Sequence, residues 1–84
     1  MYKTYTNYKE FKNDFYWHNA KLQNFLKELY PDICWEFESC YTSDPEASKL
    51  NIFYHSLDHS KDLSVIGRKN GTSYDFEVFQ ILEK

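Results

Sequence analysis

Residues 63–78 read Leu-Ser-Val-Ile-Gly-Arg-Lys-Asn-Gly-Thr-Ser-Tyr-Asp-Phe-Glu-Val, and this stretch decides the fold. Asn70-Gly71 is a strong hairpin signal, because a tight two-residue turn favours these residue types. A turn there places all the apolar partners of the two strands on one face, as the register of a half-buried hairpin requires. We therefore expect antiparallel strands over residues 63–69 and 72–82. The predicted pairs are Lys69 with Thr72, Gly67 with Tyr74, Val65 with Phe76 and Leu63 with Val78.

Two further strands are expected upstream of the hairpin. Residues 33–41 alternate between apolar and polar, which is typical of a strand with one buried face. Residues 50–56 form the next strand, with a loop over residues 42–48 before it and a turn over residues 58–61 after it. The first strand is expected to point Ile33, Trp35, Phe37 and Tyr41 to one face and Cys34, Glu36, Glu38 and Cys40 to the other.

A single helix is expected over residues 7–29, ahead of the strands. Asn7 followed by Glu10 has the form of a capping box. Apolar residues then recur at helical spacing, with His18 on the same stripe as a core-edge histidine. Pro31 ends the helix, because the residue before a proline avoids the helical region. The fold class is therefore α+β, with an N-terminal helix packed on a four-stranded antiparallel meander whose first and last strands are the edges.

Composition limits the kind of protein this can be. The 84 residues are enough for a single domain, residues 1–84, and eight Tyr, seven Phe and two Trp enlarge its modest core. The formal net charge of -3 argues against direct binding to nucleic acid. No apolar run is as long as a membrane span and no signal-peptide pattern opens the chain, so we expect a cytoplasmic protein that does not bind membranes.

Neither a metal site nor a catalytic site is expected. Cys34, Cys40, His55 and His59 are spaced loosely like a two-Cys, two-His zinc finger. However, six residues of strand span about 20 Å, so the two cysteines cannot share a metal or a disulfide unless the strand folds back. Ser56 next to His55 lacks the glycine elbow of a serine nucleophile. We therefore expect no metal, no cofactor and no enzymatic activity.

The face of the sheet turned away from the helix is expected to bind a macromolecule. By alternation it carries carboxylates around an apolar patch, and an exposed apolar patch with a polar rim typically marks an interaction site. The residues expected to form an apolar pocket there are Phe53, Leu57, Ile66, Phe79 and Ile81.

Two short stretches resemble the uracil-DNA glycosylase inhibitors, small acidic proteins of phages and mobile elements. Residues 35–39, Trp-Glu-Phe-Glu-Ser, are similar to an early strand of the staphylococcal-type inhibitor. Pro45-Glu46 stands where a Pro-Glu pair follows in the Bacillus-phage form. Residues 65–67 with Asn70 and residues 75–76 are similar to the paired strands of the staphylococcal form. The resemblance covers about half the chain, in order.

The resemblance implies a DNA mimic that acts in the cytoplasm of a bacterial host. Its partner would be uracil-DNA glycosylase, whose DNA groove it blocks and whose leucine wedge it sequesters. The residues implied for partner binding are Glu36, Glu38, Ser39 and Glu46. The first two would lie about 6.7 Å apart by strand rise, about two phosphate steps of DNA. Two other functions stay open: a different phage anti-defence inhibitor of a nucleic-acid enzyme, such as an anti-CRISPR protein, and a homodimeric structural domain.

Overall fold

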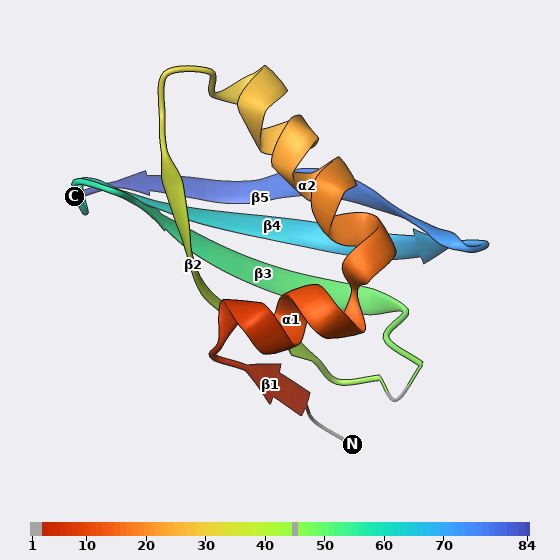
Figure 1. The fold of residues 1–84 in the computed structure, drawn as a ribbon. Helices are drawn as coiled ribbons and strands as arrows, with labels where there is room; N and C mark the ends of the chain where they lie inside the picture. Colours follow the sequence, from red (N-terminus) through yellow and green to blue (C-terminus); the bar gives the residue numbers. More distant parts are fainter. Residues whose placement is uncertain (1–2, 45) are drawn as a thin grey trace.

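The computed structural model describes residues 3–44 and 46–84, with the backbone alone for residues 16–18. It is an α+β fold, as expected, but it has two helices and five strands where one helix and four strands were predicted (Figure 1). The strands form one antiparallel sheet in sequence order. In chain order the elements are β1 Lys3–Tyr5, α1 Tyr8–Asp14, α2 Tyr16–Leu29, β2 Trp35–Thr42, β3 Lys49–Ser56, β4 Lys61–Asn70 and β5 Ser73–Glu83.

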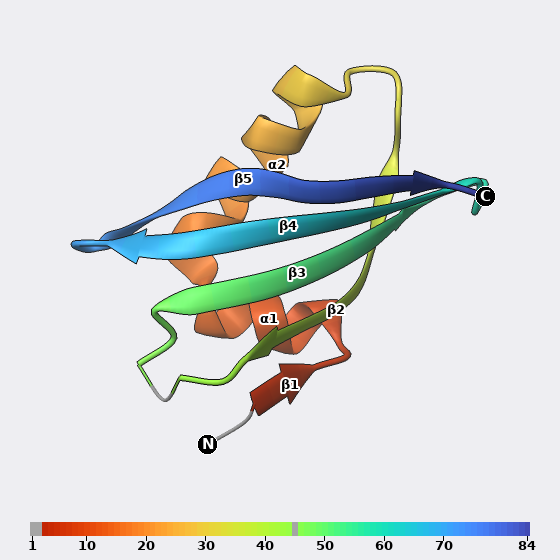
Figure 2. The ribbon, with the colours of Figure 1, turned by 180° about the vertical axis from the view of Figure 1, so that it is seen from behind.

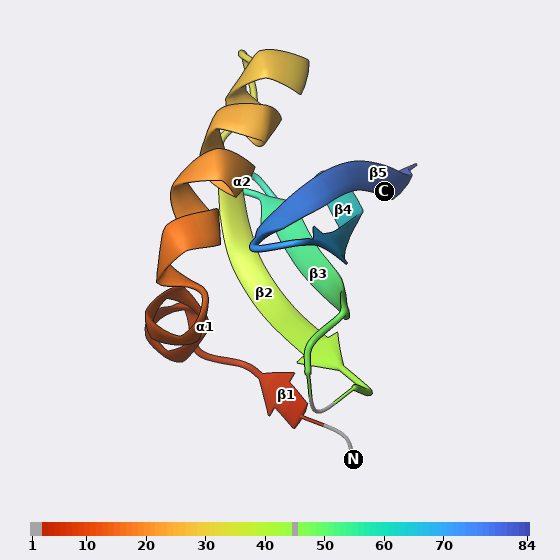
Figure 3. The same cartoon turned by 90° about the vertical axis from the view of Figure 1, so that its right-hand side faces the viewer.

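Both helices lie on one face of the sheet (Figure 3), and the opposite face carries no helix in the described part of the chain (Figure 2). The core fills the space between the two layers and is rich in rings, as the composition suggests. Phe11 of α1 stacks on Phe37 of β2 with ring centroids 5.2 Å apart, and Leu22 of α2 is fully buried. No helix among the described residues is long and apolar enough to cross a membrane.

The helix predicted over residues 7–29 is broken at Phe15. Asn7 caps the first helix as expected, since its Oδ1 accepts the backbone N–H of Lys9 at 2.8 Å. Phe15 then leaves the helical region, with φ -118° and ψ 40°. Its buried ring packs against Tyr5 of β1 and Tyr74 of β5. We attribute the break to this packing, which the stripe of apolar residues did not reveal. The side chain of His18 lies outside the described residues.

Strand β1 was not predicted, and it changes which part of β2 is an edge. It pairs with the C-terminal part of β2 alone: Lys3 lies opposite Thr42, and Tyr5 lies opposite Cys40. A three-residue strand is too short to show a period of two. The pairing of β1 with β2 ends at Cys40. Among the residues that the structure describes, residues 35–39 of β2 therefore have β3 on one side and no strand on the other.

The predicted register of the β4–β5 hairpin is wrong by two residues. Asn70 pairs with Ser73, so the turn is Gly71-Thr72 and not Asn70-Gly71. Gly71 has φ +64° and Thr72 does not have a positive φ, which is the pattern of a type II′ turn with Gly first. Near the turn, a register shift of two residues leaves every side chain on its predicted face of the sheet but gives it a different cross-strand partner. Gly67 now faces Phe76, and Val65 faces Val78.

The predicted alternation of β2 is correct only up to a β-bulge at Glu38. Phe37 pairs with Tyr54 and Ser39 pairs with Phe53, which leaves Glu38 as the extra residue. Beyond it the faces are exchanged: Cys40 is buried on the helix side, and Tyr41 lies on the open face against Phe53, opposite to the prediction for both. One extra residue moves every later side chain to the other face.

Candidate functional site

The acidic stretch of β2 lies at a border of the sheet where the described residues provide no further strand. We call residues 35–39 the edge segment. Glu36 and Glu38 within it are both exposed, and Ser39 is half-buried. Because Glu38 occupies the bulge, the regular strand rise does not set the separation between the two carboxylates. The edge segment therefore presents two exposed carboxylates, separated by Phe37, on an accessible strand.

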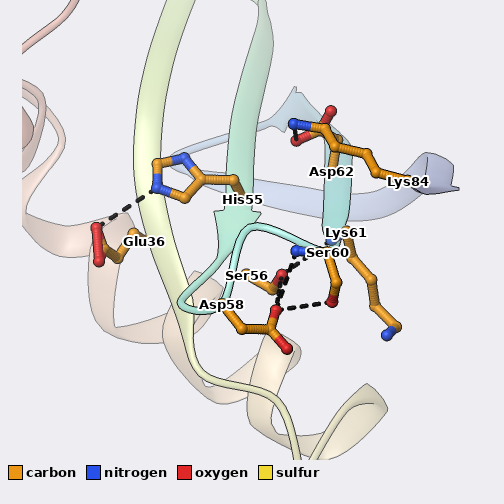
Figure 4. Close-up of polar contacts among 8 residues, drawn as sticks. All are labelled: Glu36, His55, Ser56, Asp58, Ser60, Lys61, Asp62 and Lys84. Carbon is orange, nitrogen blue, oxygen red and sulfur yellow. Dashed lines mark hydrogen bonds and ion pairs between the residues drawn. The ribbon is translucent and has the colours of Figure 1, made fainter.

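Glu36 is held by a histidine from the next strand. Its Oε2 lies 3.4 Å from Nε2 of His55, its cross-strand partner, and half of its side chain is exposed (Figure 4). The His55 ring in turn stacks on His59, with centroids 4.7 Å apart. Glu36 is thus oriented by the imidazole of His55, which carries a positive charge only when it is protonated.

The other two predicted partner-binding residues differ in position. Ser39 lies directly opposite Phe53 on the open face, so the edge segment leads into the centre of that face. Glu46 is exposed but belongs to the loop between β2 and β3, where its backbone N–H donates to Oδ1 of Asp44 at 2.9 Å. Pro45, quoted with Glu46 in the resemblance, lies outside the described residues.

Three of the five residues predicted for an apolar pocket come together. Phe53, Ile66 and Phe79 line one hollow of about 270 Å³ on the open face of the sheet. Tyr41 lines it too and stacks on Phe53 at 5.7 Å between ring centroids, a contact that sequence reasoning missed because of the bulge. Phe79 is 68 % exposed, which is unusual for a side chain of its size. The other residues around this hollow are Lys49, Asn51, Ser64, Val65 and Gln80.

The remaining two residues, Leu57 and Ile81, lie elsewhere. Leu57 belongs to the turn after β3 and lines a different hollow, beside Cys34. Ile81 pairs with the buried Leu63, so it lies on the helix side of the sheet and not on the open face. The cause is a second irregularity, in β5 at Phe79, which shifts the alternation by one residue.

The turn between β3 and β4 is organised around one carboxylate. Oδ1 of Asp58 accepts the hydroxyls of Ser56 and Ser60, both at 2.7 Å, and the backbone N–H of Ser60 at 3.0 Å (Figure 4). The hydrogen bonds from Ser60 and Ser56 hold the pKa of Asp58 well below its usual range. Because the Ser56 hydroxyl also accepts the N–H of Lys61, it serves the turn and is not arranged as a nucleophile beside His55.

The two cysteines lie in different environments. Cys34 is exposed, whereas Cys40 is completely buried, and burial raises the pKa of its thiol to about 12. Within residues 3–44 and 46–84 no group of three or more His, Cys, Asp or Glu side chains is placed to hold a metal ion.

Comparison with protein-family models, curated proteins and solved structures finds no match to this chain.

Proposed function

We propose that this chain is a DNA-mimicking protein inhibitor of uracil-DNA glycosylase that blocks the DNA-binding groove of the enzyme. The observation that carries the proposal is the edge segment, which presents the exposed carboxylates of Glu36 and Glu38 on an accessible border of the sheet. A DNA-binding groove is lined by cations that neutralise phosphates, and carboxylates on a strand can take the place of those phosphates. No catalytic role for the chain is part of this proposal.

The distribution of ion pairs supports the choice of the edge segment. Two of the three carboxylates of β5 are neutralised within the chain, since Glu77 lies 3.1 Å from Arg68 and Asp75 lies 3.6 Å from Lys21. The third, Glu83 at the end of the strand, takes part in none of the ion pairs found among the described residues. Glu38 takes part in none of the ion pairs found among the described residues, nor does Glu46. A carboxylate without a cationic neighbour contributes its full charge to the field that attracts a basic groove.

The apolar hollow on the open face supplies the second contact of the proposed complex. Enzymes that flip bases insert an apolar side chain into the base stack. In the proposal the leucine wedge of the glycosylase enters the hollow formed by Phe53, Ile66 and Phe79. Because Ser39 lies opposite Phe53, the acidic edge and the hollow are adjacent on one surface.

The test of this mode of action is competition. A bacterial uracil-DNA glycosylase is mixed with a fluorescent uracil-containing duplex, and this chain is added while the anisotropy of the duplex is followed. Displacement of the duplex at about one chain per enzyme supports the proposal. Retention of the duplex in the presence of the chain, with no complex of enzyme and chain, contradicts it.

A homodimeric domain is the second candidate, because the open face exposes much apolar surface. Phe79 and Leu82 of β5 are 68 % and 51 % exposed, and β5 is the last strand of the sheet. An open edge with exposed apolar side chains is a surface on which a second copy can pair. Size-exclusion chromatography with light scattering separates the two candidates: twice the mass of the chain favours the dimer, and the mass of one chain excludes it.

A further inference from the structure

A pair of histidines lies next to the acidic edge of the sheet. The rings of His55 in β3 and His59 in the following turn stack with centroids 4.7 Å apart and 19° between their planes. Nε2 of His55 lies 3.4 Å from Oε2 of Glu36 (Figure 4). His59 takes part in none of the ion pairs found among the described residues. One ring of the pair therefore acts on the edge segment directly, and the other does not.

The two side chains of this contact differ in exposure. The side chain of His55 is 18 % exposed, whereas that of Glu36 is 50 % exposed. A charge on the mostly covered imidazole is screened by salt less than a charge in open solvent. Glu36 keeps half of its surface toward solvent, where a cationic group of a partner can reach it. His55 and a partner's cation therefore act on the same carboxylate from two sides.

The other carboxylates around His55 are already engaged. Asp62 is its cross-strand partner in β4, and Oδ1 of Asp62 lies 3.2 Å from Nζ of Lys84 (Figure 4). Asp58 is held by hydrogen bonds within its own turn. Among the ion pairs of the described residues, the one that includes His55 is therefore formed with Glu36.

The chemistry of this contact makes the charge of the edge depend on pH. Histidine is the side chain whose charge changes near neutral pH, whereas carboxylates and lysines normally stay charged there. When His55 takes up a proton, its positive charge lies beside Glu36 and cancels much of the attraction of that carboxylate for another cation. When His55 loses the proton, Glu36 regains its full charge. Binding of a cation at this edge should therefore weaken as pH falls and strengthen as pH rises.

We propose that His55 is a positioning residue that switches the charge of the edge segment with pH, so that a cationic partner binds more tightly at neutral pH than in mild acid. Protonated His55 holds Glu36 in an ion pair, and neutral His55 leaves the charge of Glu36 to the partner. The switch rests on the proposed function in one respect, that the edge segment meets a cationic surface. It does not depend on which enzyme carries that surface.

The test uses a rhodamine-labelled oligoarginine peptide as the probe and follows its fluorescence anisotropy. Arginine keeps its charge throughout, so the probe itself does not titrate. At about 0.1 M salt, charges more than about 10 Å apart are largely screened. We expect the unmodified chain to bind the peptide about threefold to fivefold more weakly at about pH 6 than at about pH 7.5, the effect of one surface ion pair. His55→Gln, which cannot take up the proton, should lose this dependence, and so should Glu36→Gln.

The matched control is His59→Asn, which removes the other imidazole of the stack and leaves the contact with Glu36 in place. Each histidine variant loses one titrating ring, so the two change net charge alike as pH falls. Asparagine also suits the positive φ of 60° at this position. His59→Asn should therefore keep the pH dependence of the unmodified chain.

The switch is overturned if the unmodified chain binds the peptide equally at both pH values, or not at all. It is also overturned if His59→Asn flattens the pH profile as much as His55→Gln does, or if Glu36→Gln keeps the full dependence. Because the peptide measurement contains no glycosylase, its result is separate from that of the competition assay.

Discussion

Replacing Glu38 by alanine should weaken the proposed complex with the glycosylase far more than replacing Glu77. Both substitutions remove one negative charge from an exposed carboxylate of the sheet. Truncating a charge that is paired in a desolvated interface costs about 2–5 kcal/mol, whereas a rim charge changes mainly the association rate. At about 1.4 kcal/mol per factor of ten, Glu38→Ala should raise the dissociation constant about 30-fold or more.

The structure makes Glu77 a suitable control. Its carboxylate is already 3.1 Å from Arg68, and both side chains are more than half exposed. A surface pair of this kind contributes about 0–1 kcal/mol to stability, so Glu77→Ala leaves the fold intact. Its effect on the complex should stay below about fivefold and should shrink as salt is added.

The assay measures dissociation of each variant from an immobilised bacterial uracil-DNA glycosylase, at low and at physiological salt. Glu38→Ala should dissociate at least about 30 times faster than the unmodified chain at both salt concentrations, because a desolvated pair is screened little. If Glu77→Ala dissociates as fast as Glu38→Ala, or faster, the edge segment is not the part that enters the groove.

Three further predictions concern the fold. Iodoacetamide should alkylate the exposed Cys34 and spare Cys40, whose thiol has a pKa of about 12, and equal rates would contradict this burial. Gly67→Ala should lower the free energy of unfolding in urea by about 1–3 kcal/mol, because the added Cβ lies 2.9 Å from Cε1 of Phe76; an unchanged midpoint would refute the close packing. The lowered pKa of Asp58 stabilises the fold above the unfolded-state pKa of about 3.9, and this contribution is lost as pH falls below it. Asp58→Asn should therefore flatten the loss of stability between about pH 5 and pH 2, and parallel curves for the two proteins would refute the role of this carboxylate.

The faces of the sheet could be predicted from the sequence wherever the strands are regular. Near the hairpin the error in register was two residues, which preserves the face of each side chain, so Val65 and Phe76 were correctly placed on the helix side. Each bulge adds one residue, which reverses the faces beyond it. Tyr41 after the bulge of β2 and Ile81 after that of β5 were misplaced for this reason.

The features that escaped prediction depend on contacts between distant parts of the chain. The break at Phe15 follows from rings of β1 and β5, which no helical periodicity contains. Strand β1 is defined by its partner in β2 and not by its own three residues. A hollow around Trp35 and Tyr54 joins four elements, which no pattern within a single strand or helix contains. By contrast, Phe53, Ile66 and Phe79 do line one hollow, because they lie on three neighbouring strands and none of them comes after a bulge.

The most direct test of the proposed function is titration of the purified chain into a uracil-excision assay with a bacterial uracil-DNA glycosylase. We expect excision to fall in proportion to added chain and to stop near one chain per enzyme, because a site of this kind should bind with nanomolar affinity or tighter. Undiminished excision with the chain at about tenfold excess, a generous ratio for such an affinity, would contradict it.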